Sequence, residues 1–432
     1  MAGDWTTGRL GDCVLLQSGG TPSKSRSDYW EGDVPWVSAK DMKSYWIENT
    51  EDHLSATGAE EATRIVAEGT TLMLVRGMTL HNDIPICRIK HPAAFNQDVK
   101  AVLAREGTEG DFVPYLLLGN KGRLLSIVDS AGHGTGRLNS DTLLDLPVHI
   151  PPVSDQRAIS HVLGTLDDKI ELNRKMNQTL ETMAQAIFKM WFIDFDHVHA
   201  KAERRKIDLS SDLAALFPSS FEDSELGEIP KEWRVVSVDD LVSLSRDSVN
   251  PLDYPAERFY HFSIPAFDDG RVPKTELGTD IKSNKFIVTP DSVLLSKLNP
   301  RIPRIWLPKT DGQMRSVCST EFLVASPKIG ISREYLFSLF TSQTFDSIFA
   351  TLVTGTSGSH QRVKAEGLLG MQVNIPPEKL ITAYTKIVKP FFDQVNKNIY
   401  QSRTLAVMRD VLLPKLLSGE IRVNDALTEV MS

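Results

Sequence analysis

Apolar and polar residues alternate in short runs through the first 150 residues of the chain. These runs contain β-branched or apolar residues and are interrupted by Gly, Asn and Pro, a pattern typical of short strands joined by turns. We predict strands at residues 34–37, 71–75, 84–89 and 99–103, and a helix at 112–125, where the apolar residues have helical spacing. The pattern therefore indicates a β-rich domain with some helix over residues 1–151.

The pattern changes after Ile150-Pro151-Pro152. In residues 154–192 Gly and Pro almost disappear, and apolar residues recur at alternating spacings of three and four, which is typical of the seam of a coiled coil. We place a helical region at 152–200. Because Gly164 is unfavourable inside a helix, we expect a short helix, a break, and then a long helix at about 166–192, roughly 40 Å long at about 1.5 Å per residue.

The chain repeats itself 225 residues later. Val148-His149-Ile150-Pro151-Pro152 returns as Val373-Asn374-Ile375-Pro376-Pro377, and the same offset holds without a gap from Gly132 to Phe192. Such a repeat predicts two like folding units. We expect a second β-rich domain at 233–376 and a second helical region at 377–432, with a break near Pro390 and a long helix at about 391–417. The polar residues 201–232 are interpreted as a loop-like connector.

The apolar stripe on each long helix is too narrow to stabilise an isolated helix, so each helix needs a partner. The other long helix is the best candidate, and packing of each helix on its own domain is the alternative. Asn173 and Asn398 occupy equivalent seam positions and could fix the register by pairing, at a cost in stability. The predicted seam residues are Leu166, Ile170, Asn173, Leu180 and Ile187 in the first helix and Phe391, Val395, Asn398, Leu405 and Leu412 in the second.

The composition is that of a globular protein. The chain has 432 residues, of which 41% are hydrophobic and 24% charged, so disorder is not expected. No apolar run reaches the roughly 18 residues of a membrane span, and the first residues lack the features of a signal peptide, so we expect a cytoplasmic protein. Cys13, Cys87 and Cys318 are too few and too scattered for a disulfide framework or a zinc site; we expect buried thiols.

The net charge of −8 argues against a protein that coats nucleic acid with its whole surface. The charge is unevenly distributed, however. Residues 282–309 contain six basic residues and a single acidic one, Asp291. One face of the second half can therefore be strongly positive.

A search for catalytic motifs finds little. The sequence contains no Walker loop, no Gly-x-Ser-x-Gly and no His-Glu-x-x-His. Asn299-Pro300-Arg301-Ile302 lacks the second proline and the aromatic residue of an adenine methyltransferase motif, and His197-Val198-His199 lacks further metal ligands nearby. We predict no catalytic residue, metal or cofactor in this chain, and keep two alternatives: a stand-alone DNA methyltransferase and a duplicated protein-binding scaffold.

Two glycine-rich segments occupy the same place in the two halves, residues 132–137 and 354–364. Each is small and flexible, carries hydroxyl groups and has an Arg at or near its end, which suits close approach to phosphates. Plain structural turns are the alternative. Arg76 and Lys297 end equivalent apolar strands, and the segment after Lys297 carries side chains able to contact base edges. The predicted DNA contacts are Arg76, Arg137, Lys297, Arg301, Arg304, Arg362 and Lys364, with Ser38, Lys40, Thr135, Ser359 and His360 as secondary candidates.

Several passages together resemble a known family, the specificity (S) subunits of type I restriction-modification systems. The resemblance covers essentially the whole chain, with the tandem architecture its strongest component. The second half departs from the Gly-Gly-Thr-Pro pattern and has Asp247-Ser248-Val249-Asn250-Pro251 instead. The passages are Leu10-Gly11-Asp12, Gln17-Ser18-Gly19-Gly20-Thr21-Pro22-Ser23, Tyr29-Trp30, Gly32-Asp33-Val34-Pro35-Trp36-Val37-Ser38, Lys40-Asp41-Met42, the Ile-Pro-Pro entry to each helical region, and Phe221, Asp223-Ser224-Glu225-Leu226-Gly227-Glu228-Ile229-Pro230 and Trp233.

The resemblance implies a non-catalytic DNA-binding subunit with an α+β fold. Two target-recognition domains, related by a pseudo-twofold axis, would each read one half of a bipartite DNA sequence. The two long helices would pair as an antiparallel coiled coil that sets the gap between the half-sites. Two modification (methyltransferase) subunits using S-adenosylmethionine, and restriction subunits driven by ATP and Mg²⁺, would dock on this chain.

Overall fold

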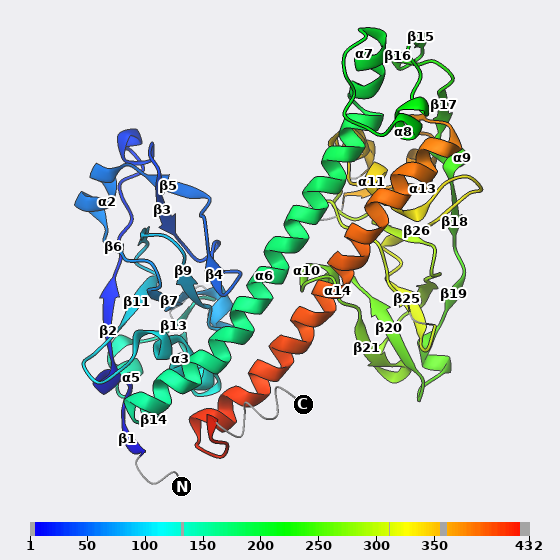
Figure 1. The fold of residues 1–432 in the computed structure, drawn as a ribbon. Helices are drawn as coiled ribbons and strands as arrows, with labels where there is room; N and C mark the ends of the chain where they lie inside the picture. Colours follow the sequence, from blue (N-terminus) through cyan, green and yellow to red (C-terminus); the bar gives the residue numbers. More distant parts are fainter. Residues whose placement is uncertain (1–4, 131–133, 311, 355–360, 424–432) are drawn as a thin grey trace. The chain divides into compact units, whose positions relative to one another are not determined.

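The computed structural model describes residues 5–130, 134–310, 312–354 and 361–423. The chain forms two compact units (Figure 1). Unit 1 is Met1–Leu172 with Thr404–Ser432, and unit 2 is Asn173–Arg403. Each unit therefore combines one β-rich domain with part of each of the two long helices.

Unit 1 contains a mixed five-stranded sheet in the order β2-β11-β7-β9-β4 and a four-stranded sheet in the order β5-β3-β10-β6. Its strands are β1 (Thr6–Arg9), β2 (Val14–Ser18), β3 (Val34–Val37), β4 (Trp46–Ile47), β5 (Asp52–Leu54), β6 (Ile65–Val66), β7 (Thr71–Leu74), β8 (Arg76–Gly77), β9 (Ile86–Ile89), β10 (Ala93–Phe95), β11 (Val99–Ala104), β12 (Asp129–Ser130), β13 (Gly136–Arg137) and β14 (Pro147–Ile150). Its short helices are α1 (Leu10–Cys13), α2 (Ala56–Ala62), α3 (Val113–Gly119), α4 (Lys121–Ser126) and α5 (Ser140–Leu144). The four predicted strands correspond to β3, β7, β9 and β11, and the predicted helix at 112–125 is divided at Asn120 into α3 and α4.

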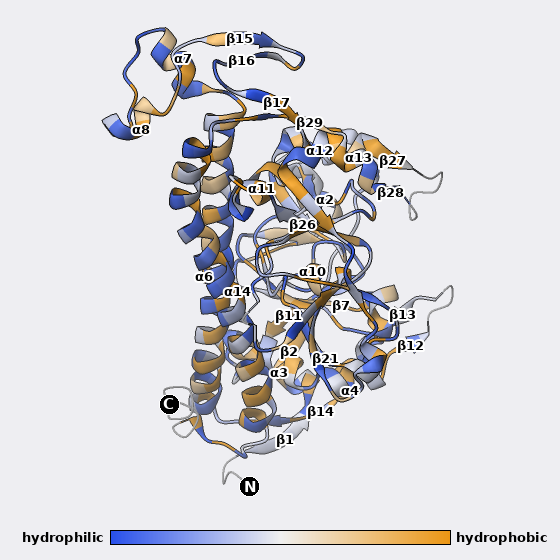
Figure 2. Cartoon of the chain, turned by 90° about the vertical axis from the view of Figure 1, so that its right-hand side faces the viewer, coloured by the Kyte–Doolittle hydropathy of each residue, from blue (hydrophilic) through white to orange (hydrophobic). Residues whose placement is uncertain are grey.

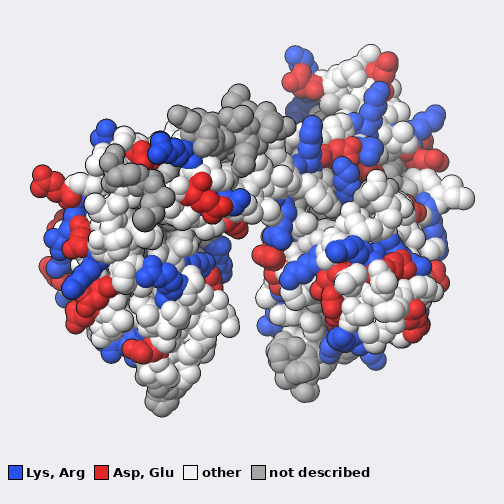
Figure 3. All heavy atoms as spheres, turned by 90° about the horizontal axis from the view of Figure 1, so that it is seen from below, with Lys and Arg blue, Asp and Glu red and all other residues white. Residues whose placement is uncertain are grey.

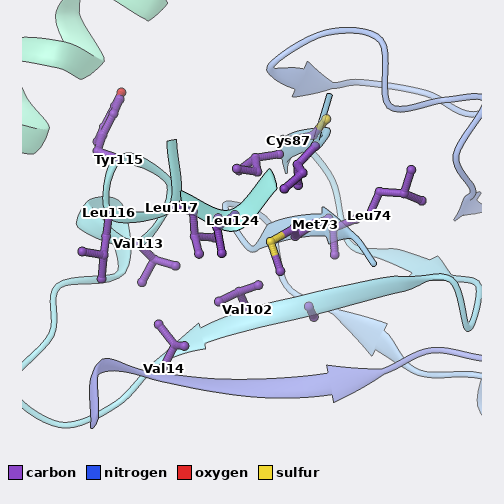
Figure 4. Close-up of a cluster of buried hydrophobic side chains, with 14 of the residues drawn as sticks. Val14, Met73, Leu74, Cys87, Val102, Val113, Tyr115, Leu116, Leu117 and Leu124 are labelled. Atoms are coloured by element: carbon purple, nitrogen blue, oxygen red, sulfur yellow. The ribbon is translucent and has the colours of Figure 1, made fainter. Parts of the chain in front are cut away.

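The core of unit 1 lies between the five-stranded sheet and helices α3 and α4 (Figure 4). Met73 of β7 and Val102 of β11 point from the sheet towards Leu117 and Leu124 of the helices, and all four are nearly completely buried. β7 is buried along its whole length, which explains why its sequence is a continuous apolar run.

Unit 2 contains a four-stranded sheet in the order β18-β26-β23-β24 and a five-stranded sheet in the order β19-β22-β25-β20-β21. Its strands are β15 (Phe221–Ser224), β16 (Gly227–Pro230), β17 (Arg234–Ser237), β18 (Val242–Ser245), β19 (Ser248–Val249), β20 (Arg258–Phe262), β21 (Lys274–Leu277), β22 (Lys285–Ile287), β23 (Val293–Ser296), β24 (Ile305–Trp306), β25 (Arg315–Cys318), β26 (Phe322–Pro327), β27 (Val353–Thr354), β28 (Arg362–Val363) and β29 (Gln372–Ile375). Its short helices are α7 (Asp196–Ala202), α8 (Ser211–Ala215), α9 (Val238–Leu241), α10 (Ile264–Asp268), α11 (Arg333–Phe340), α12 (Gln343–Phe349) and α13 (Ala365–Leu369).

The two β-rich domains share one plan, as the repeat predicts. The antiparallel ladder β1–β14 has its counterpart in β17–β29, and the order β2-β11-β7-β9 has its counterpart in β18-β26-β23-β24. Even a local cap is repeated: the carboxylate of Asp12 accepts the backbone N–H of Arg9 at 2.7 Å, and the carboxylate of Asp240 accepts that of Ser237 at 3.0 Å. The sequence repeat is therefore a structural repeat.

Two long helices, α6 (Val153–Phe192) and α14 (Glu378–Leu417), complete the units. Each has 40 residues and is about 60 Å long at about 1.5 Å per residue. The expected breaks at Gly164 and Pro390 are absent, so the predicted helix starts at about 166 and 391 were wrong. Leu163, which precedes Gly164, and Val388, two residues before Pro390, are fully buried, whereas Pro390 itself is exposed. Packing of these neighbours therefore outweighs the low helix propensity of Gly and Pro.

The two long helices pack together in antiparallel fashion within each unit, and polar and apolar residues alternate along both (Figure 2). In unit 2 the amide of Asn173 donates to Gln401 and Ser402, and the amide of Asn398 donates to Asn177 at 2.8 Å. Asn173 and Asn398 therefore do not bond each other. Each bonds a residue on the opposite helix that lies four positions after the other asparagine. Of the predicted seam residues, Leu166, Asn173, Val395, Asn398 and Leu412 are buried, and Ile170, Leu180, Ile187, Phe391 and Leu405 are half-buried.

The segment between the halves is more ordered than predicted. Residues 201–232 were interpreted as loop-like, but they include the end of α7, helix α8 and the hairpin β15–β16. Trp191 at the end of α6 packs edge-on against Phe217, with ring centroids 5.1 Å apart. This aromatic contact fixes the segment on unit 2, and aromatic residues so far apart in the sequence give no periodic signal.

Candidate nucleic-acid interface

In unit 1 the structure brings two of the predicted DNA-contacting residues together. Arg76 on β8 lies directly opposite Arg137 on β13, in an antiparallel pair that also matches Gly77 with Gly136. Both side chains are exposed. Like charges in directly opposed strand positions destabilise a sheet, so this arrangement is expected where an anion binds.

The surroundings of this arginine pair leave its positive charge available. Asp129 on β12 lies opposite Arg137 on the other side, but among the described residues neither Arg76 nor Arg137 forms an ion pair or a side-chain hydrogen bond. Nε2 of His81, in the turn after β8, lies 3.0 Å from the carbonyl oxygen of Gly134. This contact connects the turn with the glycine-rich segment. Thr135, a secondary candidate, is half-buried in this segment.

In unit 2 the corresponding strands also place two predicted cations side by side. Lys297 follows β23, and its carbonyl oxygen accepts the backbone N–H of Val363 at 3.0 Å, while Leu298 forms a bridge with Arg362 of β28. Lys364 is the next residue after β28 and is exposed. The 225-residue offset relates Arg362 to Arg137, so both domains carry a pair of cations where the end of an apolar strand meets the strand after the glycine-rich segment.

These three cations line a groove of about 530 Å³ on unit 2. Arg246, which follows β18, lines it as well, together with the apolar residues Phe286 and Phe322. Arg246 was not predicted from the sequence, because only the strand order places it beside residues more than 50 positions away. Glu366 lines the groove too, with its carboxylate 3.9 Å from Nη2 of Arg246. The four cations outnumber this carboxylate, so the groove remains electrostatically favourable for a phosphate backbone.

Arg362 is held in place by an acidic neighbour. Its Nε and Nη2 donate to the two carboxylate oxygens of Glu321 at 2.9 and 3.0 Å, and this pairing raises the pKa of Arg362 above its ordinary value. A guanidinium presents its N–H donors in a planar fork, so the bidentate pair with Glu321 fixes the orientation of the group. Glu321 is therefore a candidate positioning residue.

Arg301 has a different position. It is exposed on the turn between β23 and β24, next to Asn299, whose φ of 50° is in the left-handed region. The backbone N–H of Asn299 donates to the carbonyl oxygen of Gln361 at 2.9 Å, which attaches this turn to the segment before β28. Arg301 thus extends the same cationic region of unit 2.

Three residues that were predicted to contact DNA form polar contacts within the protein. Arg304 forms a bidentate pair with Asp268 at 2.7 and 3.0 Å, and its side chain is only 13% exposed. Lys40 is bound by Glu51 and Asp52, each at 2.9 Å, and Ser38 is buried with its hydroxyl donating to Asp41 at 2.8 Å. These contacts favour structural roles for all three residues. Ser359 and His360 lie outside the described residues.

Charge is mixed on the face of the molecule that Figure 3 draws. Lys and Arg side chains are interspersed there with Asp and Glu side chains over both units. Within the basic segment 282–309, Lys285 is buried and Arg304 is compensated by Asp268. Lys282, Arg301 and Lys309 of this segment are exposed and Lys297 lines the groove, so part of the expected positive charge remains at the surface.

Other predicted features can be placed directly. Cys13, Cys87 and Cys318 are free and buried, as predicted. In the described parts of the chain, no group of three or more His, Cys, Asp or Glu side chains is arranged to hold a metal ion. No helix among the described residues is both long and apolar enough to cross a membrane.

Comparison with known proteins agrees with the architecture. Residues 2–182 match the family model described as type I restriction modification DNA specificity domain. The chain is 25% identical to the type I restriction enzyme MjaIX specificity subunit of Methanocaldococcus jannaschii, over 98% of this chain and 94% of that one. It is 27% identical to the type I restriction enzyme HindI specificity subunit of Haemophilus influenzae, over 72% and 77% of the two chains.

A solved structure shares the fold. The S subunit of the type I restriction-modification system of M. genitalium superposes with a TM-score of 0.55 at 12% identity, over 96% of each chain. This likeness covers both β-rich domains and both long helices of the present chain. Over nearly its whole length the chain is therefore similar to type I restriction enzyme specificity subunits, and residues 2–182 match the model of their DNA specificity domain.

Proposed function

We propose that this chain reads a bipartite sequence in double-stranded DNA, with one β-rich domain at each half-site. One observation carries the proposal: the arginine pair of unit 1 and the cations of the groove in unit 2 occupy corresponding places in the repeat. Two like domains with like cationic sites suit a target with two separated parts. The loops around these sites differ in sequence, so the two half-sites should differ as well.

We further propose a division of roles among the predicted residues. Arg76, Arg137, Lys297 and Lys364 contact phosphates and set the position of each domain on the duplex. Arg362, oriented by Glu321, and Arg301, on its exposed turn, are better placed for base edges, because bidentate donors distinguish guanine from other bases. Arg304, Lys40 and Ser38 stabilise the domains instead.

The helical regions complete the proposal. Helices α6 and α14 set the gap between the half-sites and provide the docking surface for two modification subunits and for the restriction subunits. Methylation would use S-adenosylmethionine in the modification subunits, and translocation and cleavage would use ATP and Mg²⁺ in the restriction subunits, so this chain would be non-catalytic. We expect the complex to act in the cytoplasm.

The test is to map methylated adenines in DNA from cells that contain this chain with its modification subunit. The proposal expects one motif made of two specific parts separated by a fixed unspecific gap. Replacing Arg301 and Arg362 with Ala should relax only one part of the motif and leave the other part and the gap unchanged. Methylation that depends on a single continuous motif, or that is independent of this chain, would overturn the proposal.

Binding measurements on the isolated chain separate the two alternative functions. A stand-alone methyltransferase would bind S-adenosylmethionine as the isolated chain, which equilibrium dialysis would detect. A protein-binding scaffold would show no affinity for duplex DNA at any salt concentration, whereas phosphate contacts make affinity fall steeply as salt increases.

A further inference from the structure

The contacts between the two long helices follow the repeat at the centre of the seam. In unit 2, Asn173 bonds Ser402 and Asn398 bonds Asn177. The offset of 225 residues relates Asn173 to Asn398 and Asn177 to Ser402, so the two hydrogen-bonded pairs are equivalent. At these positions either helix could pair with a second copy of itself and keep a polar partner.

The next seam position does not follow the repeat. In unit 1 the carboxylate of Asp167, which is 4% exposed, accepts from Nη1 of Arg409 at 2.6 Å. The repeat relates Asp167 to Phe392 and Arg409 to Ala184, which are both buried in the apolar core of unit 2. One half of the structure thus has a buried ion pair where the other half has an aromatic ring and a methyl group.

The β-rich domains match this difference. In unit 1 the hydroxyl of Tyr115 on α3 donates to Asp167 at 2.9 Å. In unit 2 the ring of Phe337 on α11 packs edge-on against Phe392, with centroids 5.1 Å apart. Each domain therefore presents to its seam residue the chemistry that the residue requires.

A steric difference lies at the end of α14. A Cβ atom on Gly119 would be 2.0 Å from Cδ1 of Leu417, so this leucine fills the space that the glycine leaves. The repeat relates Leu417 to Phe192, whose ring packs against Trp233 and Tyr384 in unit 2. A phenylalanine in the place of Leu417 would exceed the space beside Gly119, and overpacking destabilises a core.

We infer that Asp167 and Arg409, together with the fit of Leu417 beside Gly119, make the first half of this chain select a second half as its partner and reject another first half. Pairing of two first halves would place Ala184 opposite Asp167 and leave a buried carboxylate without its cation, which is strongly destabilising. Pairing of two second halves would place Arg409 against Phe392. Specificity arises because each wrong pairing carries a penalty that the right pairing lacks.

The interaction surface of the first half therefore fits a defined kind of partner. The partner is an antiparallel helix with a basic residue at the position of Arg409 and a leucine two turns later, at the position of Leu417. A second half from a related protein with these two features should be accepted. This inference concerns assembly and does not depend on which DNA sequence the chain reads.

The experiment produces the whole chain as two co-expressed segments, 1–208 and 209–432. The first segment is made in two versions with different affinity tags, and material recovered by one tag is quantified for the other tag and for the second segment. We expect the recovered first segment to carry a roughly equal amount of the second segment. The first segment with the other tag should amount to less than about one tenth of the second segment, since a penalty of about 1.4 kcal/mol already gives a tenfold preference.

Variants distinguish the ion pair from general stability. With Asp167→Asn and Arg409→Gln together, recovery of the other first segment should rise several-fold, whereas Arg409→Lys keeps the charge and should preserve selection. The matched control, Asp168→Asn with Arg403→Gln, changes an exposed acid and an exposed base on the same helices and should have no effect. Equal recovery of both tags with the unaltered segments, failure of the two segments to bind each other, or unchanged selection in the neutral double variant would each overturn the inference.

Discussion

Arg76 and Arg137 lie directly opposite one another on the antiparallel strands β8 and β13, 61 positions apart in the sequence. Both guanidinium groups are exposed, and neither forms an ion pair with a described residue, although Asp129 on β12 lies opposite Arg137. The protein therefore retains an electrostatic repulsion that a bound phosphate would relieve.

Replacing Arg76 or Arg137 with Ala should weaken DNA binding in the assembled methyltransferase complex and reduce the dependence of affinity on salt. Each lost phosphate contact should lower the slope of log affinity against log salt by about one. Fluorescence anisotropy with a labelled duplex over a range of salt concentrations measures both quantities. Arg26→Ala is the control, because Arg26 pairs with Asp28. An unchanged slope in both variants would remove these residues from the interface.

Asn398→Ala should destabilise the protein by about 1 to 3 kcal/mol, because it leaves the amide of the buried Asn177 without its partner. Replacing Asn177 and Asn398 together with Leu should cost much less, since both polar groups are then removed from the seam. Thermal unfolding followed by circular dichroism compares the variants. If the double variant were less stable than Asn398→Ala, the hydrogen bond would not be the reason for the loss.

The stability of unit 2 should fall as the pH decreases below about 6.5, because burial lowers the pKa of His197. The imidazole lies against Phe217, with ring centroids 4.9 Å apart, and its buried Nε2 has no hydrogen-bond partner among the residues that the structure describes. In the unfolded chain His197 takes up a proton near pH 6.5, whereas in the folded chain it does so only at lower pH, so acid favours unfolding over this interval.

His197→Phe should remove this part of the pH dependence while it preserves the aromatic packing. Unfolding temperatures measured between pH 5 and pH 8 provide the test. His199→Phe changes a neighbouring, exposed histidine and should leave the pH profile of the wild type unchanged. A profile that is the same in the wild type and in His197→Phe would contradict the assignment.

Gly19→Ala should destabilise unit 1 by about 1 to 3 kcal/mol or more, because a Cβ atom would lie 2.0 Å from the carbonyl oxygen of Phe95. That carbonyl already accepts the N–H of Gly20 and the hydroxyl of Thr63 and has little room to move. In Gly122→Ala, by contrast, the new methyl group meets no atom within 4 Å, and the helical position should gain up to about 1 kcal/mol. Thermal unfolding of the two variants should shift in opposite directions.

The elements that the sequence predicted well are those that depend on periodicity. The apolar runs at β3, β7, β9 and β11 and the seam of α6 are visible because one buried face imposes a regular spacing. The sequence did not predict that the helices continue through Gly164 and Pro390, because this continuity depends on the packing of buried neighbouring residues.

The candidate site shows the same division. The equivalence of Arg137 and Arg362 could be predicted, because the repeat is recognisable in the sequence itself. The ion pair of Arg304 could not be predicted, because the carboxylate that compensates it is 36 positions away. The ion pair of Asp167 with Arg409 joins residues 242 positions apart, and no local pattern indicates it.

The division of each long helix between the units bears on how the chain matures during synthesis. Leu412, Leu413, Leu416 and Leu417 belong to the hydrophobic core that also contains Leu10 and Val14. The amino-terminal domain thus cannot acquire its full core until residues 412–417 have been synthesised, although domains that appear first generally fold first. The nascent chain must keep that core surface from aggregating until the end of α14 emerges, so termination between residues 404 and 412 would damage unit 1 more than unit 2.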